Sequence, residues 1–141
     1  MNKESAAAVI DRLELVSHPE GGFYRETYRD APANGNRGAL TVIYYLLPQG
    51  VRSAWHRVDA TEVWHYYAGA PLELTVAGAD ARAVYTLGVD FVAGQTAHAV
   101  VPAHAWQSAI SLGDWTLVGC TVAPAFDFAG FQLAPPGWSP V

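Results

Sequence analysis

The sequence predicts an all-β protein, a sandwich or barrel of short strands preceded by one helix. Eight or more short segments rich in β-branched and aromatic residues follow one another at nearly regular spacing. Glycine, proline or aspartate separates each segment from the next, and helical periodicity is confined to the first residues. A chain of 141 residues is long enough for one buried core and too short for two ordinary domains, so we expect a single domain over residues 1–141.

The N-terminal helix is predicted over Ser5 to Leu15. Val9, Ile10 and Leu13 fall on one face at helical spacing, and the neighbouring alanines favour the helical conformation. The sequence HPEGG at residues 18–22 then ends the helix, because proline restricts the preceding residue and the two glycines permit positive φ.

The rest of the chain is predicted to form strands joined by turns. The expected strands cover residues 23–29, 39–47, 53–57, 62–67, 71–76, 81–87, 96–101, 105–110 and 115–122. From Pro124 onward, Phe126, Phe128 and Phe131 are expected to form a packed cover over the strands.

The composition excludes several classes of protein. A formal net charge of −5 argues against nucleic-acid binding, which needs a basic surface. No apolar run approaches the roughly 20 residues that cross a bilayer, and the N-terminus does not read as a signal peptide. The single cysteine, Cys120, lies in an apolar run and is expected to be a buried thiol. We therefore expect a cytoplasmic protein that binds neither nucleic acid nor membrane.

The stretch from Gly50 to Gly69 carries the main chemical signal. If Val58 to Ala60 form the turn of a hairpin centred on Asp59, His56 and Glu62 lie directly opposite each other. Opposed side chains in an antiparallel pair begin roughly 5 Å apart, close enough to share a proton or a metal ion. The same register places Ala54 opposite Trp64 and Arg52 opposite Tyr66.

The spacing of Gly50, His56, Val58, Glu62 and Gly69 resembles the first signature of the cupin superfamily, with valine in place of its second histidine. The second signature, Pro-x-Gly-x-x-His, is matched by residues 102–107, where His104 replaces the glycine and Gln107 the histidine.

The chain as a whole is similar to one small cupin subfamily of unknown function, cupin family five. The similar phrases are HPEGG followed by YRE at residues 18–26, WH at 55–56, EVWHYYAG at 62–69, VP at 101–102, WQ at 106–107 and GCTVAP at 119–124. The resemblance implies a double-stranded β-helix, the cupin jelly-roll barrel, which forms a homodimer and contains a pocket like that of sugar-nucleotide epimerases.

A metal centre is one hypothesis for this pocket. The candidate ligands are His56, Glu62 and Gln107, a set poor for zinc or copper and tolerable for a water-rich ion such as manganese or magnesium. No cofactor is certain from the sequence, and a divalent ion is the candidate.

Proton transfer without a metal is the other hypothesis. A carboxylate beside His56 stabilises its imidazolium, and histidine titrates near neutral pH. The epimerases of similar fold use such a pair with a tyrosine on the opposite face of the sugar. Tyr66 is the first candidate for this phenol, and Tyr24 and Tyr44 are alternatives.

Further candidates for ligand binding surround the two signatures. They are Tyr24, Arg25, Arg52, Trp64, Trp106 and Gln107. An arginine can clamp a phosphate or carboxylate, and an indole can stack on a ring-shaped ligand. Glu20 is a candidate for the rim of the pocket, while the turn around it is expected to be structural.

Three functions follow from these readings. The first is small-molecule binding with isomerase or epimerase chemistry on a sugar-like or carboxylate-bearing compound. The second is a metal-dependent enzyme such as a dioxygenase, and the third is a non-catalytic sensor or storage module that binds a metabolite.

Overall fold

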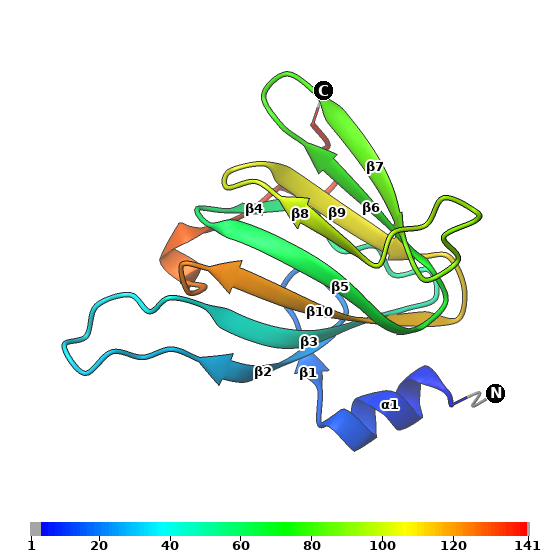
Figure 1. The fold of residues 1–141 in the computed structure, drawn as a ribbon, viewed down its shortest axis with the longest axis horizontal. Coiled ribbons are helices and arrows are strands. Elements are labelled where there is room, and N and C mark those ends of the chain that lie inside the picture. The colour runs from blue at the N-terminus through cyan, green and yellow to red at the C-terminus, as the bar shows by residue number, and fades with distance from the viewer. Residues whose placement is uncertain (1–3, 141) are drawn as a thin grey trace.

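The computed structural model describes residues 4–140 as two facing antiparallel sheets with one helix against the outside of the larger sheet (Figure 1). The larger sheet contains, in spatial order, β1 (Val16–Ser17), β2 (Phe23–Arg29), β3 (Thr41–Pro48), β10 (Trp115–Ala123), β5 (Thr61–Gly69) and β8 (His98–Val101). The smaller sheet contains β11 (Phe131–Leu133), β4 (His56–Val58), β9 (Trp106–Ser111), β6 (Leu72–Ala77) and β7 (Arg82–Leu87). The predicted all-β fold with one N-terminal helix is confirmed.

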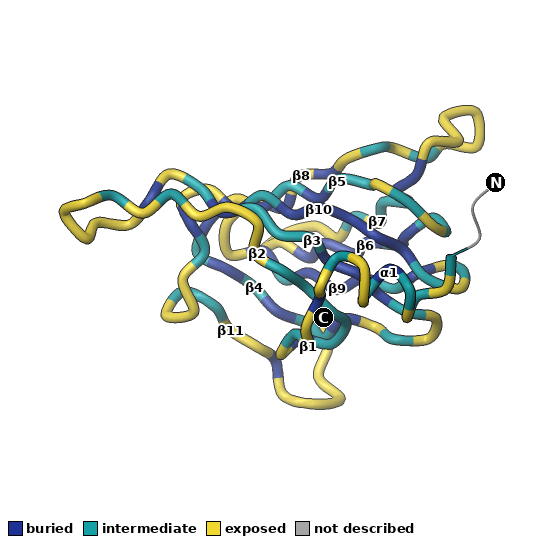
Figure 2. The backbone as a smooth tube through the Cα atoms, turned by 90° about the horizontal axis from the view of Figure 1, so that it is seen from below, coloured by how far each residue is buried: buried dark blue, intermediate teal, exposed yellow. Residues whose placement is uncertain are grey.

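The main core lies between the inner faces of the two sheets. It is made of fully buried side chains from both, among them Tyr45, Leu47, Trp64, Leu72, Leu74, Leu87, Val101 and Val118. Figure 2 shows the buried backbone concentrated in the central strands and the exposed backbone in the connecting loops. Cys120 belongs to this core, as expected from its apolar sequence context.

The helix α1 (Ala6–Leu13) packs on the outer face of the larger sheet. Its N-cap is Ser5, whose hydroxyl accepts a hydrogen bond from the Ala8 amide at 3.1 Å. Glu14 ends the helix in a left-handed conformation with φ of 57°. A helix of 8 residues is marginal in isolation, so its stability depends on burying Val9 against the sheet.

Two short strands and one turn of 3-10 helix were not predicted. β1 pairs with β2, and β11 pairs with β4 after the 3-10 helix η1 (Phe128–Gly130). The three-residue strand β11 is held by its partner strand rather than by a strong pattern of its own, which explains why the sequence did not reveal it.

The predicted hairpin between His56 and Glu62 is wrong. β4 pairs with β11 and β9, whereas β5 pairs with β10 and β8, so the two residues lie in different sheets. The connection between them crosses from one sheet to the other instead of folding back on itself. Asp59 anchors this crossing through an ion pair with Arg37 at 2.8 Å and through its amide, which donates to the Gly130 carbonyl at 3.1 Å. The expected pairings of Ala54 with Trp64 and of Arg52 with Tyr66 are therefore absent.

No helix within residues 4–140 is both long and apolar enough to span a membrane.

Candidate functional site

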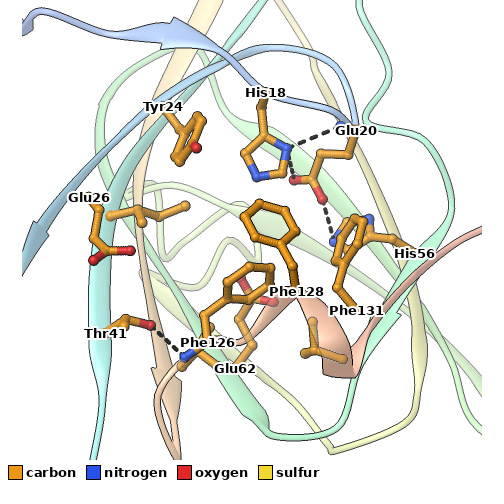
Figure 3. Close-up of a pocket in the computed structure, with 13 residues that line it drawn as sticks. His18, Glu20, Tyr24, Glu26, Thr41, His56, Glu62, Phe126, Phe128 and Phe131 are labelled. Atoms are coloured by element: carbon orange, nitrogen blue, oxygen red, sulfur yellow. Dashed lines mark hydrogen bonds and ion pairs between the residues drawn. The ribbon is translucent and has the colours of Figure 1, made fainter. Parts of the chain in front are cut away.

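A narrow cavity lies between the two sheets, with a volume of about 60 Å³ open to the centre of a water molecule (Figure 3). Strands from both sheets, the turn before β2 and the segment after β10 all contribute to its wall. The lining side chains are His18, Glu20, Tyr24, Glu26, Thr41, Ile43, His56, Val58, Glu62, Val122, Phe126, Phe128 and Phe131. The cavity thus combines a cluster of titratable groups with an aromatic wall.

Glu20 is directed into this cavity by the tight turn at residues 18–22. The His18 amide donates to the Gly22 carbonyl at 3.0 Å, and the Gly21 amide donates back to the His18 carbonyl at 3.0 Å. Gly22 has φ of 76°, and a Cβ there would lie 2.7 Å from the Leu46 carbonyl oxygen, so only glycine fits. The Glu20 carbonyl also accepts from the Ala54 amide at 2.7 Å, which ties the turn to the chain entering β4.

His56 is the ion-pair partner of Glu20. Its Nε2 lies 2.8 Å from Oε2 of Glu20, and its Nδ1 lies 2.7 Å from the carbonyl oxygen of Ala54. Both neighbours are acceptors, so both ring nitrogens carry protons and the side chain is an imidazolium. Burial by itself lowers the pKa of His56, but the charge and hydrogen bond of Glu20 outweigh burial and raise the pKa to about 9.

The pKa of Glu20 is shifted downward, in the opposite direction to that of His56. Burial by itself raises its pKa, but the charge and hydrogen bond of His56 hold the pKa of Glu20 below its usual value. The Glu20–His56 pair is therefore a buried salt bridge that stays ionised at neutral pH.

Glu62 is the second buried carboxyl group, and it is held in a different way. Nε2 of Gln107 donates to Oε1 of Glu62 at 2.9 Å, while Oε1 of Gln107 accepts from the Trp64 indole at 2.8 Å. Because the indole nitrogen only donates, this network fixes the orientation of the Gln107 amide. Burial raises the pKa of Glu62 to about 7, although the charge of His56 opposes the shift. Glu62 can therefore gain or lose a proton near neutral pH.

The other predicted site residues divide between the cavity and the rest of the molecule. Tyr24 lines the cavity, and Trp64 and Gln107 support Glu62 from the core. The Tyr66 hydroxyl donates to the Gly69 carbonyl at 2.5 Å, and Tyr66 does not line the cavity. The available phenol in the lining is instead that of Tyr24.

Neither predicted arginine lines the cavity. Arg25 pairs with Glu14 at 3.2 Å, and Arg52 donates to the Ser108 hydroxyl at 3.3 Å. Trp106 also lies elsewhere, against the Trp138 ring at a centroid distance of 4.6 Å.

Two residues that sequence reasoning placed in a structural turn or at the rim belong to the centre of the site. Glu20 is the direct partner of His56, and His18 lies beside them with its side chain 7% exposed. The signal was an acidic residue and a histidine on either side of a proline, just before two glycines. Their inward direction depends on the turn geometry, which the sequence pattern alone did not reveal.

The predicted metal ligands do not fit a divalent ion. Both nitrogens of His56 are committed to acceptors, and the amide oxygen of Gln107 is committed to the Trp64 indole. An imidazolium has no lone pair to offer, and the Gln107 group that reaches Glu62 is the amide nitrogen, which is no ligand. No three His, Cys, Asp or Glu side chains within residues 4–140 are grouped to hold an ion.

His104 occupies the position where the cupin signature has glycine. Its φ is 69°, in the left-handed region, and its amide donates to the Val58 carbonyl at 2.8 Å. The backbone conformation therefore retains the shape that glycine would adopt freely. His104 is absent from the cavity lining, so its side chain does not add a polar group there.

The two facing sheets and the enclosed cavity define a protein of the cupin jelly-roll class. A family described as Cupin superfamily (DUF985) matches residues 7–134, and the chain belongs to this family. An uncharacterised protein of Saccharomyces cerevisiae is 25% identical over 146 aligned positions, which cover 88% of this chain and 72% of the yeast protein.

Several solved structures share the fold of this chain. A protein of Shewanella oneidensis superposes with a TM-score of 0.88 and 36% identity, covering 94% of this chain and 85% of that chain. A hypothetical protein from Leishmania major superposes with a TM-score of 0.85 and 31% identity, covering 93% and 88% of the two chains. Oxalate decarboxylase of Bacillus subtilis shares the fold alone, at 12% identity and a TM-score of 0.65 over 83% of this chain and 29% of that chain.

Proposed function

We propose that this protein binds a small organic molecule in the cavity and catalyses an acid–base isomerisation, with Glu62 as the group that moves the proton. The observation that carries the proposal is that one cavity contains two buried carboxyl groups whose protonation is controlled in different ways. Glu20 is kept ionised by His56, whereas Glu62 has its pKa raised to about 7 by burial. A group whose pKa lies near the working pH is the most effective general acid or base.

The sequence predicted that His56 and Glu62 together form a proton-transfer site. An imidazolium with a pKa of about 9 has no free lone pair at neutral pH, so Glu62 and not His56 is the group that moves the proton. The charge of His56 is paired with Glu20 and also favours the ionised form of Glu62, against the effect of burial. The proposal therefore divides the work between Glu62, which takes and returns a proton, and His56, which keeps Glu20 ionised.

The aromatic wall supports binding of a compact molecule with an apolar face. Phe126, Phe128 and Phe131 contact one another with ring centroids 4.8 to 5.9 Å apart. Arg29 holds this segment against β2, because its guanidinium donates to the Phe126 carbonyl at 2.9 Å. Aromatic faces of this kind pack against the C–H side of a ring-shaped ligand.

The test is solvent deuterium incorporation. Purified protein in D₂O is incubated with a panel of neutral sugars, sugar phosphates and hydroxy acids, and loss of the C–H signal is followed by proton NMR. We expect exchange at a carbon next to a carbonyl or carboxyl group for at least one compound, and none with Glu62→Gln. Saturable binding without exchange across the panel would assign the protein to the non-catalytic sensor class instead.

A second copy of this chain is the proposed partner. Tyr67 and Val100, on the outer face of β5 and β8, are 50% and 49% exposed, and β8 is an edge strand of its sheet. Covering an exposed edge and apolar side chains favours association. Sedimentation equilibrium is expected to give a dimer for the wild type and a monomer for Val100→Asp. A monomeric wild type at micromolar concentration overturns this part of the proposal.

A further inference from the structure

A histidine that no sequence signature assigned, His18, presents a hydrogen-bond donor to the cavity. The Glu20 amide donates to Nδ1 of His18 at 3.1 Å, so Nδ1 holds a lone pair and the proton of the neutral ring sits on Nε2. Oε1 of Glu20 is 3.9 Å from the same Nδ1, too far to compete with that hydrogen bond. The tautomer is therefore set by the backbone of the turn.

Among the residues that the structure describes, none accepts a hydrogen bond from the protonated nitrogen of His18. In Figure 3 this nitrogen points away from Glu20 and into the cavity, and within residues 4–140 it has no hydrogen-bond partner. Tyr24 packs edge-on against the imidazole with ring centroids 4.5 Å apart, which restrains its rotation. Burial, with the charge of His56, holds the pKa of His18 below its usual value despite Glu20, so the ring stays neutral at pH 7.

Glu20 and Glu26, two of the three carboxyl groups that line the cavity, are already paired with cations. Glu20 is paired with His56, and Glu26 at the rim is paired with Arg29 through two contacts of 2.8 and 2.9 Å. None of the described residues that line the cavity is lysine or arginine. A phosphate or carboxylate entering the cavity would find no unpaired cation and would be repelled by Glu62 when that group is ionised.

Resting on the proposed isomerisation, we propose that the ligand is a neutral hydroxy-carbonyl compound, such as a free aldose or ketose, and that His18 binds its carbonyl oxygen through Nε2–H. This class suits His18, Glu62 and the aromatic wall of the cavity. The carbonyl oxygen accepts from His18, a C–H next to the carbonyl is acidic enough for Glu62, and the carbon skeleton packs on the phenylalanines. Of the sugar-like and carboxylate-bearing compounds expected from the sequence, the inference keeps the sugar-like class.

The chemical step balances within the ligand and Glu62. The Glu62 carboxylate takes the proton from the carbon next to the carbonyl, and the C–H electron pair forms the C=C bond of an enediolate. The C=O pair moves to oxygen, where the hydrogen bond from the His18 Nε2–H stabilises it. Glu62 then returns the proton to the former carbonyl carbon, while the neighbouring hydroxyl group passes its proton to the former carbonyl oxygen and becomes the new carbonyl. An aldose is thereby converted into its ketose isomer, and no oxidant or reductant is consumed.

The experiment compares matched ligands in direct binding. D-Xylose, D-ribose, D-fructose and D-glucose are titrated by saturation-transfer NMR or calorimetry, each beside its phosphorylated, aldonic-acid and alditol counterpart where one exists. We expect at least one of the four neutral parent sugars to bind at least about tenfold more tightly than its phosphorylated, aldonic-acid and alditol counterparts.

The residue assignment is tested with His18 variants in the same assay. His18→Phe removes the donor and is expected to weaken binding at least about tenfold, whereas His18→Gln restores an N–H and is expected to recover part of it. His65→Gln, on the outer face of β5, is the matched control and leaves binding unchanged. If His18→Phe does not fold, the comparison of His18→Gln with an N–H-free His18→Met replaces it.

Three outcomes overturn the inference: tighter binding of the anionic counterparts, equal binding of the alditols, or no binding by any neutral sugar of the panel. Unchanged affinity in the folded His18 variant also overturns it. The proposed function is tested separately. Glu62-dependent exchange on an anionic compound would leave the proposed function standing and this inference wrong. Binding of a neutral sugar that depends on His18, without deuterium exchange, would leave this inference standing and the proposed function wrong.

Discussion

Oε2 of Glu20 and Nε2 of His56 lie 2.8 Å apart, and this contact joins the turn before β2 to the first residue of β4. The two residues are distant in the chain, and Figure 3 shows them side by side on one side of the cavity. Since both are buried, neither can lose its partner without leaving an unpaired charge or changing its protonation state. The pair is therefore the point where the structure of the turn and the chemistry of the site depend on each other.

Removing Glu20 is expected to destabilise the protein. Glu20→Gln leaves His56 without its counter-ion, so the free energy of unfolding at pH 7 should fall by about 3 kcal/mol. Urea unfolding followed by tryptophan fluorescence measures this change. Glu26→Gln is the matched control, because it removes a carboxylate from an exposed pair with Arg29, and it should cost no more than about 1 kcal/mol. Equal losses in both variants would contradict the central role of the buried pair.

The stability of the wild type is expected to fall as the pH rises above 5. Glu62 and His56 both have raised pKa values in the folded protein, so each stabilises the fold fully below its unfolded pKa and loses that contribution as the pH rises through its folded pKa. For Glu62 this interval runs from 4.5 to about 7, and for His56 from 6.5 to about 9. Each accounts for up to about 3 kcal/mol. Glu20 acts with the opposite sign, since its lowered pKa gives stability that is lost only as the pH falls below 4.5.

Glu62→Gln separates catalysis from stability. The amide resembles the protonated acid and can still accept the hydrogen bond from Gln107, so the variant should fold normally and be more stable than the wild type at pH 8. Its unfolding free energy should also lose the decline between pH 4.5 and 7 that Glu62 causes. Urea titrations across this pH range provide the measurement. A variant that keeps the full decline would show that another group titrates there.

Divalent metal is not expected to bind at the predicted ligands. After dialysis against Mn²⁺ or Mg²⁺ and gel filtration, metal analysis should give far less than one equivalent for each chain, because His56 and Gln107 are already committed to other partners. Glu62→Gln should leave that residual content unchanged. One equivalent in the wild type, lost in this variant, would restore the metal hypothesis.

His104→Gly is expected to stabilise the protein slightly. A left-handed conformation costs a non-glycine residue about 1 to 2 kcal/mol, while glycine loses more backbone entropy on folding by roughly 0.5 to 1 kcal/mol. With φ of 69° at this position, the net gain should be about 0.5 kcal/mol in urea unfolding. His98→Gly, in strand β8, is the comparison, and it should lower the stability.

The strand pattern could be predicted because alternation and turn residues are local properties. The helix, the strands and the buried Cys120 all follow from short segments of sequence, and the cupin signatures indicated the family. The short strand β11 and the crossing at Asp59 were missed, since each is stabilised by a partner distant in the chain.

The sequence by itself identified His56, Glu62 and Gln107 as a group, because their spacing is that of a known signature. Only the tertiary structure decided what they do. The turn at residues 18–22 brings Glu20 to His56 and places the proton of His18 on Nε2. Gln107 positions the Glu62 carboxyl group, and burial raises its pKa to about 7. Protonation depends on which neighbours share a buried space, and the packing of the two sheets determines those neighbours.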